Sequence, residues 1–146
     1  MKITNRKAFF NFELLDRFEA GITLYGQEVK AIRLGHADLT GSFVKIIGSE
    51  AYLVNAKIFP YENARTDDYD PTRTRKLLLH KSEIISLKSK IDSQNLNIVP
   101  LSIYLKSHLV KVELALGKSK KKYDKKQSIK KKDLQRELET DLSSRS

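Results

Sequence analysis

The 146-residue sequence contains no cysteine, which excludes disulfides and catalysis by a thiol. A chain without cysteine suits a reducing compartment, so we expect a cytoplasmic protein. No apolar run approaches the roughly 18 residues that are needed to cross a bilayer. The basic N-terminus, residues 1–7, lacks the apolar stretch of a signal peptide.

The sequence also lacks the patterns of common catalytic and cofactor sites. His36, His80 and His108 lie in unrelated segments, without a neighbouring nucleophile or carboxylate pattern. The aspartates within residues 67–70 lack the spacing and the glycine of a calcium loop, so a polar turn is the favoured interpretation. There is no phosphate-binding glycine loop, dinucleotide fingerprint or zinc-spaced cluster. We expect a binding protein rather than an enzyme, with no cofactor and no metal.

Positive charge is plentiful and uneven, with a net charge of +10. Residues 117–146 hold eleven Lys or Arg and five Asp or Glu, whereas residues 1–116 hold 17 and 13. The composition thus predicts a domain over residues 1–116 and a basic tail over residues 117–146. This asymmetry is typical of proteins that bind a polyanion, most often nucleic acid and less often an anionic membrane. A tail that only increases solubility is the alternative.

The part before residue 117 shows mostly strand patterns. Runs of apolar residues bounded by glycine, proline or polar residues predict strands at 9–12, 19–26, 42–47, 51–59, 75–80, 98–105 and 110–116. A short helix is expected at 28–34, and another after Ser82, with Ile84, Leu87 and Ile91 on one face. Residues 61–72 are expected to form a surface loop. We predict a mainly β fold with some α, an antiparallel β-barrel of the oligonucleotide-binding type with flanking helices.

The tail combines a lysine-rich stretch with leucines at every fourth position, Leu134, Leu138 and Leu142. Its lysines come early and its acids late, which opposes the helix dipole. We therefore expect this basic C-terminal tail to be disordered alone and helical only against a partner. The leucine stripe is too narrow for a membrane-surface helix and lacks interfacial Trp or Phe.

Basic groups before the tail also suggest binding to nucleic acid. Arg6 and Lys7 precede the first predicted strand, while Arg73 and Arg75 share one face of an extended segment beside Lys76. Guanidinium groups suit phosphates. Four aromatic residues could stack on bases, although a place in the core is the favoured interpretation for most: Phe9, Phe10, Tyr25 and Tyr104.

Several strings occur in a recognisable order over nearly the whole chain. They are Asn5-Arg6-Lys7-Ala8, Glu19-Ala20-Gly21-Ile22, Gly26-Gln27-Glu28-Val29-Lys30, Pro60-Tyr61-Glu62, the residues from Asp70 to Lys81, Val99-Pro100-Leu101, the residues from Val110 to Ala115, and Tyr123-Asp124-Lys125. In these strings the chain resembles the SsrA-binding protein family of bacteria, also called small protein B. The long string from residue 70 to residue 81 is the most specific of them.

The resemblance implies a fold and a function. The family is an oligonucleotide-binding-type barrel that binds the tRNA-like part of transfer-messenger RNA. With elongation factor Tu it brings this RNA to ribosomes stalled on messages without a stop codon, and the incomplete product is tagged for degradation (trans-translation). The tail enters the empty messenger channel of the small subunit and folds there as a helix. The resemblance also implies a cytoplasmic monomer without a membrane partner.

The resemblance assigns residues as well. Glu28 and Lys30 fall on the RNA-binding helix, while Leu78 and His80 fall on the RNA-binding strand. From the residues alone, Glu28 is equally an acid that the helix dipole favours. For Leu78, support of the RNA-facing surface is favoured over contact. The ribosome-binding tail residues are Lys118, Lys120, Lys121, Lys122, Tyr123, Asp124, Lys125 and Lys126.

The chain departs from the family pattern at two places. Ser119 stands where the family has glycine before paired lysines, with Gly117 two residues earlier, so the geometry of the hinge is open. Ala31 replaces a small hydroxyl residue, which should matter little. A second function stays open: a ribosomal or general RNA-packaging protein, whose binding would fall steeply with salt and show no preference for a tRNA-like RNA.

Overall fold

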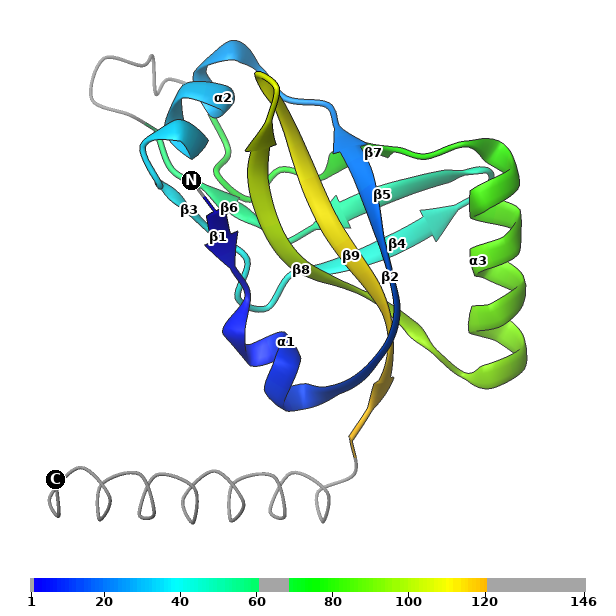
Figure 1. Cartoon of the computed structure of the whole chain (residues 1–146). Helices are drawn as coiled ribbons and strands as arrows, with labels where there is room; N and C mark the ends of the chain where they lie inside the picture. The colour runs from blue at the N-terminus through cyan, green and yellow to red at the C-terminus, as the bar shows by residue number, and fades with distance from the viewer. Residues whose placement is uncertain (1, 61–68, 121–146) are drawn as a thin grey trace, which may run out of the picture.

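The computed structural model describes residues 2–60 and 69–120, which contain nine strands and three helices (Figure 1). In chain order the elements are β1 (Lys2–Thr4), α1 (Arg6–Asn11), β2 (Phe12–Ile22), α2 (Gly26–Arg33), β3 (Ala37–Asp38), β4 (Phe43–Ile47), β5 (Glu50–Val54), β6 (Lys57–Ile58), β7 (Arg75–Leu78), α3 (Lys81–Gln94), β8 (Asn97–Lys106) and β9 (Leu109–Ser119). None of the helices in these residues is long and apolar enough to cross a membrane.

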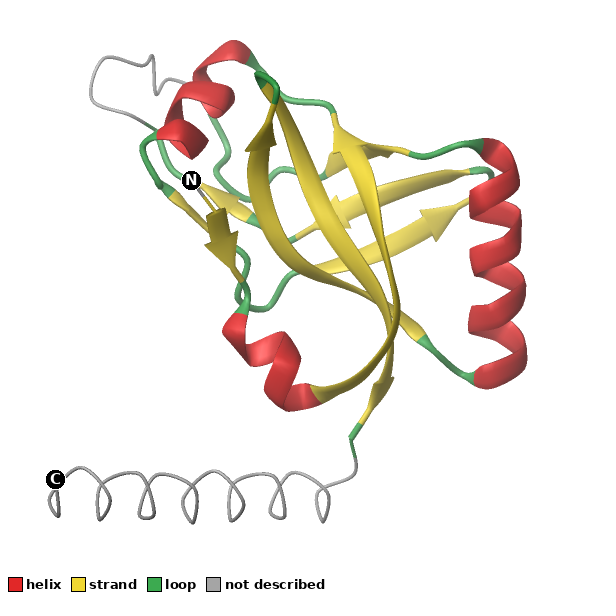
Figure 2. Cartoon of the chain, in the orientation of Figure 1, coloured by secondary structure: helices red, strands yellow, loops and turns green. Residues whose placement is uncertain are grey.

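Seven strands form one antiparallel sheet in the order β1-β8-β9-β2-β7-β5-β4, while β3 pairs with β6. The sheet coils so strongly that β4 contacts β8, which closes it into a barrel (Figure 2). Closure reduces the number of unpaired strand edges. Figure 1 shows α1 and α2 at opposite ends of the barrel and α3 along its side. The predicted fold class, an antiparallel barrel with flanking helices, is confirmed for the described residues.

The hairpin of β8 and β9 forms the long curved wall of the barrel (Figure 1). Ser107 and His108 join the strands with positive φ angles of 49° and 70°. This left-handed conformation at both positions suits the natural twist of a two-residue hairpin turn. Along β9, Val110, Val112 and Leu114 are buried while Lys111 and Glu113 are half-buried, which is the period of two of a strand, and Ala115 is also buried.

Helix α3 packs on the barrel through the face that its periodicity predicted. Ile84 and Leu87 are buried, and Ile91 packs against the same core. The helix begins two residues earlier than expected, since His80 rather than Ser82 is the N-cap residue. It ends at Asn95, whose φ of 53° is the left-handed conformation of many helix ends.

The strand predicted at residues 9–12 is wrong, because most of this segment belongs to α1. Ala8 of α1 is buried in a small second core with Val99, Leu101 and Ala115, whereas Phe9 is exposed. The apolar run therefore reflects a helix that caps the end of the barrel. Only tertiary packing distinguishes this arrangement from a strand.

The single strand predicted at 51–59 is two strands, β5 and β6. Asn55 between them has a positive φ of 67°, which interrupts the extended chain. Strand β6 then pairs with β3 instead of continuing in the main sheet. The prediction missed the break because asparagine tolerates this conformation without the glycine that usually marks it.

Strand β9 extends three residues beyond the predicted strand end at residue 116. Lys118 pairs with Glu13 and Ser119 with Phe12, and the Lys120 N–H donates to the Asn11 carbonyl at 3.0 Å. Gly117 is buried within this pairing, and a Cβ there would lie 2.9 Å from Val99 Cγ2. Gly117 thus permits close packing and is not the hinge of the tail. The rest of the predicted tail, residues 121–146, lies outside the described residues.

Candidate nucleic-acid interface

The first turn of α2 places Glu28 at the centre of a polar cluster. Glu28 is the third residue of the helix, and its carboxylate accepts a 2.8 Å hydrogen bond from the Tyr25 N–H. This is the carboxylate half of a capping box, so the helix start fixes where the side chain points. The side chain of Glu28 has no exposed surface.

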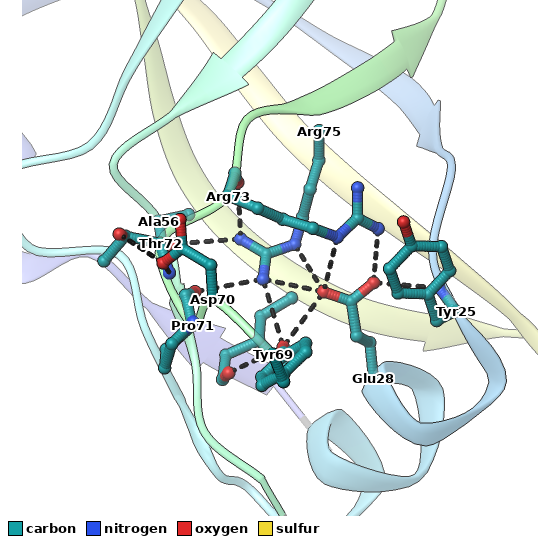
Figure 3. Close-up of polar contacts among 10 residues, drawn as sticks. Tyr25, Glu28, Ala56, Tyr69, Asp70, Pro71, Thr72, Arg73 and Arg75 are labelled. Carbon is teal, nitrogen blue, oxygen red and sulfur yellow. Dashed lines mark hydrogen bonds and ion pairs between the residues drawn. The ribbon is translucent and has the colours of Figure 1, made fainter. Parts of the chain in front are cut away.

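Two arginines bind the Glu28 carboxylate, Arg73 from the segment before β7 and Arg75 from the first position of β7 (Figure 3). Arg75 Nε donates to Glu28 Oε2 at 2.8 Å, and Arg73 Nε donates to the same oxygen at 3.2 Å. The second carboxylate oxygen pairs with Arg73 Nη2. The two-residue spacing predicted that both arginines point to one face, and the structure brings both to Glu28.

Arg75 is a completely buried cation. Its guanidinium donates to the carbonyls of Ala56 at 2.9 Å, Arg73 at 3.0 Å and Pro71 at 3.0 Å, besides Glu28. A buried guanidinium needs such partners because desolvation of an unpaired charge is costly. Arg75 therefore ties the loop before β7 to the barrel and has no surface with which to contact a ligand.

The electrostatic balance keeps Glu28 ionised. Burial alone would raise the pKa of Glu28, but hydrogen bonds from Arg73, the Tyr25 N–H and Arg75 outweigh it and hold this pKa below its usual range. The Tyr69 hydroxyl oxygen lies 3.0 Å from Glu28 Oε2 and 2.8 Å from the Ile58 carbonyl, so its single hydrogen is shared between these two acceptors. Burial, together with the nearby Glu28 charge, raises the pKa of Tyr69.

Arg73 connects this buried cluster to the surface. Its guanidinium lies over the Tyr25 ring, 4.0 Å from the ring centroid, and the Tyr25 side chain is 57% exposed. Glu28 thus fixes Arg73, which in turn supports an exposed aromatic ring. The core placement favoured for most of the candidate aromatics does not hold for Tyr25, because its ring covers the arginine from outside.

Beside the cluster, β7 presents alternate side chains to solvent. Arg75 and Leu77 are buried, whereas Lys76 and Leu78 are exposed. Leu78 is 56% exposed and is available for contact, although the sequence favoured a supporting role. Lys76 pairs with the exposed Glu50 at 2.9 Å. The side chain of His80 is almost fully exposed at the start of α3.

The structure separates the other predicted RNA-binding residues from this cluster. Arg6 and Lys7 are exposed on α1, at the end of the barrel opposite α2 (Figure 1). Lys30 is exposed on α2. Of the predicted tail residues, Lys118 belongs to β9 and Lys120 follows it, while Lys121, Lys122, Tyr123, Asp124, Lys125 and Lys126 lie outside the described residues.

Sequence analysis did not predict that the β8–β9 turn lies beside the exposed Leu78 of β7. His108 and Lys111 line a small hollow together with Leu78, because β9 and β7 flank β2 on its two sides. The Val110-to-Ala115 string, which carried part of the resemblance, was the available signal.

Within the described ranges no group of three or more His, Asp or Glu side chains could hold a metal ion. Asp70 instead caps a turn by accepting hydrogen bonds from the N–H and hydroxyl of Thr72, both at 2.9 Å.

Comparison with known proteins places the chain. A family model described as SmpB protein matches residues 2–144. The SsrA-binding protein of Sulfurihydrogenibium sp. (strain YO3AOP1) is 50% identical over 136 residues, 93% of this chain and 90% of the relative. The SsrA-binding protein of Persephonella marina is 47% identical and covers 92% of this chain and 89% of its own.

A solved structure described as "tmRNA-SmpB: a journey to the center of the bacterial ribosome" has the same fold. It is 42% identical to this chain with a TM-score of 0.70, and the match covers 88% of this chain and 94% of the other. Family model, relatives and structure agree over nearly the full length. The chain therefore belongs to the SmpB protein family.

Proposed function

We propose that this protein binds the tRNA-like domain of transfer-messenger RNA and delivers the RNA to stalled ribosomes for trans-translation. The match to SsrA-binding proteins over more than nine tenths of the chain carries the proposal. The geometry is consistent with it, because an exposed Tyr25 ring and the exposed Lys76, Leu78 and His80 lie on neighbouring elements. The activity is binding rather than catalysis, and no cofactor is needed.

The predicted RNA-binding residues divide into two roles in this proposal. Glu28 and Arg75 have no exposed side-chain surface, so they position the interface from below. Arg73, held by Glu28, supports Tyr25, whose free face can stack on a base. Lys30, Lys76 and His80 supply donors and positive charge to the RNA backbone. Arg6 and Lys7 serve a separate part of the RNA at the α1 end of the barrel.

The tail acts on the ribosome in this proposal. Residues after Lys120 enter the empty messenger channel, where Tyr123 stacks on a base of ribosomal RNA. The protein works in the cytoplasm as a monomer, and elongation factor Tu joins through the RNA. Lys118 and Ser119 are paired with β2, so these two predicted tail residues belong to the barrel.

A competition assay at physiological salt tests RNA recognition. Labelled transfer-messenger RNA bound to the full-length chain is challenged with the same RNA unlabelled, or with ordinary tRNA. We expect the unlabelled transfer-messenger RNA to compete at much lower concentration. Equal competition by tRNA and by duplex RNA, with a steep salt dependence, would instead support a general RNA-packaging protein.

A truncation tests the division between barrel and tail. Removal of residues 121–146 leaves the β2–β9 pairing intact, whereas a cut at residue 117 would remove paired residues. We expect the shortened protein to retain its affinity for the RNA and to lose tagging of stalled chains in a reconstituted translation system. Equal loss of both activities would contradict separate roles.

A further inference from the structure

Two concave surfaces meet at the side chain of Leu78. The first, of about 350 Å³, lies between the β4–β5 turn and α3, and we call it the α3 groove. Its lining includes Leu77, Leu79, Ile84, Ser49, His80 and Lys81. The second, of about 210 Å³, lies beside the β8–β9 turn, and we call it the turn groove. Its lining includes Ile22, Leu24, Val29, His108, Val110 and Lys111. Leu78 lines both grooves and separates them.

The two grooves resemble each other in composition. Each combines aliphatic side chains with a histidine and a lysine, His80 with Lys81 and His108 with Lys111, and the α3 groove also holds the ion pair of Lys76 with Glu50. Among the described residues neither Lys81 nor Lys111 takes part in an ion pair. An apolar surface beside a lysine that makes no ion pair suits a flat base that is attached to a phosphate.

Leu78 stands between the grooves because its neighbour on β2 is a glycine. Gly21 is the register partner of Leu78, and a Cβ at Gly21 would lie 3.2 Å from Leu78 Cβ. The leucine therefore packs closely over the backbone of β2 while most of its side chain remains in solvent. Aliphatic side chains in such positions act as wedges that separate stacked bases in other nucleic-acid complexes.

We propose that Leu78 inserts between two adjacent unpaired nucleotides of the bound RNA, so that one base lies in the α3 groove and the other in the turn groove. This proposal rests on the proposed function, because its occupant is RNA. The small volumes suit a single ring system in each groove, since they lie near or below the range of about 300–1,000 Å³ for whole small-molecule sites. An apolar peptide would offer no phosphate to Lys81 and Lys111.

Fluorescence of 2-aminopurine tests the wedge, because this base analogue brightens when it loses its stacking partner. The analogue replaces, one position at a time, each unpaired base in the elbow loops of the tRNA-like domain of transfer-messenger RNA. With the full-length protein we expect the fluorescence to rise at two adjacent positions. Leu78→Ala should abolish this rise and weaken the affinity about tenfold, in the range of one lost base contact.

Ile85→Ala is the matched control, because Ile85 is an aliphatic residue on α3 that is 60% exposed and lines neither groove. It should retain both the fluorescence rise and the affinity. If the wild-type protein binds but no adjacent pair brightens, or if Leu78→Ala behaves like the control, the wedge is overturned and the proposed function stands. If the wild-type protein fails to bind the RNA, both are overturned.

Discussion

The cluster around Glu28 and the surface around Leu78 adjoin one another but differ in exposure. Glu28 and Arg75 are fully buried and every polar atom that they offer is paired, whereas Leu78 is mostly in solvent. Both regions come from the strings that carry the family resemblance. Their difference shows that one recognised motif can contain both a buried polar cluster and an exposed apolar surface.

In the proposed function, the exposed surface depends on the buried cluster around Glu28. Glu28 holds the Arg73 guanidinium, and the Tyr25 ring lies against that guanidinium. Removal of one buried partner leaves a charge without compensation, whereas removal of an exposed apolar side chain leaves none. We therefore expect mutations in the Glu28 cluster to lower stability, and mutations of the surface around Leu78 to lower RNA affinity with little effect on stability.

The largest expected effect comes from Glu28→Gln. The substitution leaves buried Arg75 and half-buried Arg73 without their anion, and we expect the free energy of unfolding to fall by about 3–5 kcal/mol. Urea denaturation measures this change. Glu50→Gln is the control, because Glu50 and its partner Lys76 are both exposed and such pairs contribute at most about 1 kcal/mol. Equal losses in the two variants would mean that the buried cluster is not a structural support.

Acid should weaken the support in a defined window. The pKa of Glu28 lies below its ordinary value of 4.5. At pH values between the lowered pKa and 4.5, the folded state therefore binds fewer protons than the unfolded state. Its contribution is complete above pH 4.5 and is lost as the pH falls through the lowered pKa. Urea midpoints from pH 7 to pH 3 should fall less steeply for Glu28→Gln than for the wild type. Parallel curves would assign the acid sensitivity to other carboxylates.

Gly21→Ala tests the boundary between the two regions. The new Cβ would lie 3.2 Å from Leu78 Cβ, a tight contact that displaces Leu78. Its cost is offset by the gain of about 0.5–1 kcal/mol from replacing a glycine within a strand. We expect the free energy of unfolding to change by less than about 1 kcal/mol, while RNA affinity decreases. Gly26→Ala, where a Cβ meets nothing within 4 Å, is the control for stability.

The smallest effect on stability is expected for Leu78→Ala. Truncation of a side chain that is 56% exposed removes little buried area, so the free energy of unfolding should change by no more than about 0.5 kcal/mol. Thermal and urea unfolding measure it. A loss above 2 kcal/mol would show that Leu78 belongs to the support, and the contrast between the two regions would disappear.

Part of the fold was predictable from local pattern alone. The period of two in β9 and the three-and-four spacing in α3 identified a strand and a helix, because burial on one face produces those periods. The strand predicted at residues 9–12 was wrong because the local pattern there is ambiguous. A short apolar run fits a strand and a capping helix equally, and only Ala8 packing on Val99 and Leu101 decides for the helix.

The candidate site was likewise predictable from the sequence only in part. The sequence by itself singled out Glu28, Arg73, Arg75 and Leu78, which all lie in recognised strings. Its charge distribution predicted a basic tail from residue 117, whereas β9 continues to Ser119. Only the tertiary structure decided which of these residues are accessible. The side chains of β7 alternate between core and solvent. The carboxylate of Glu28 meets the arginines 45 and 47 residues away because the fold packs α2 against the start of β7 and the segment before it. Which face of β7 is buried depends on packing between distant segments, so the local alternation alone does not determine it.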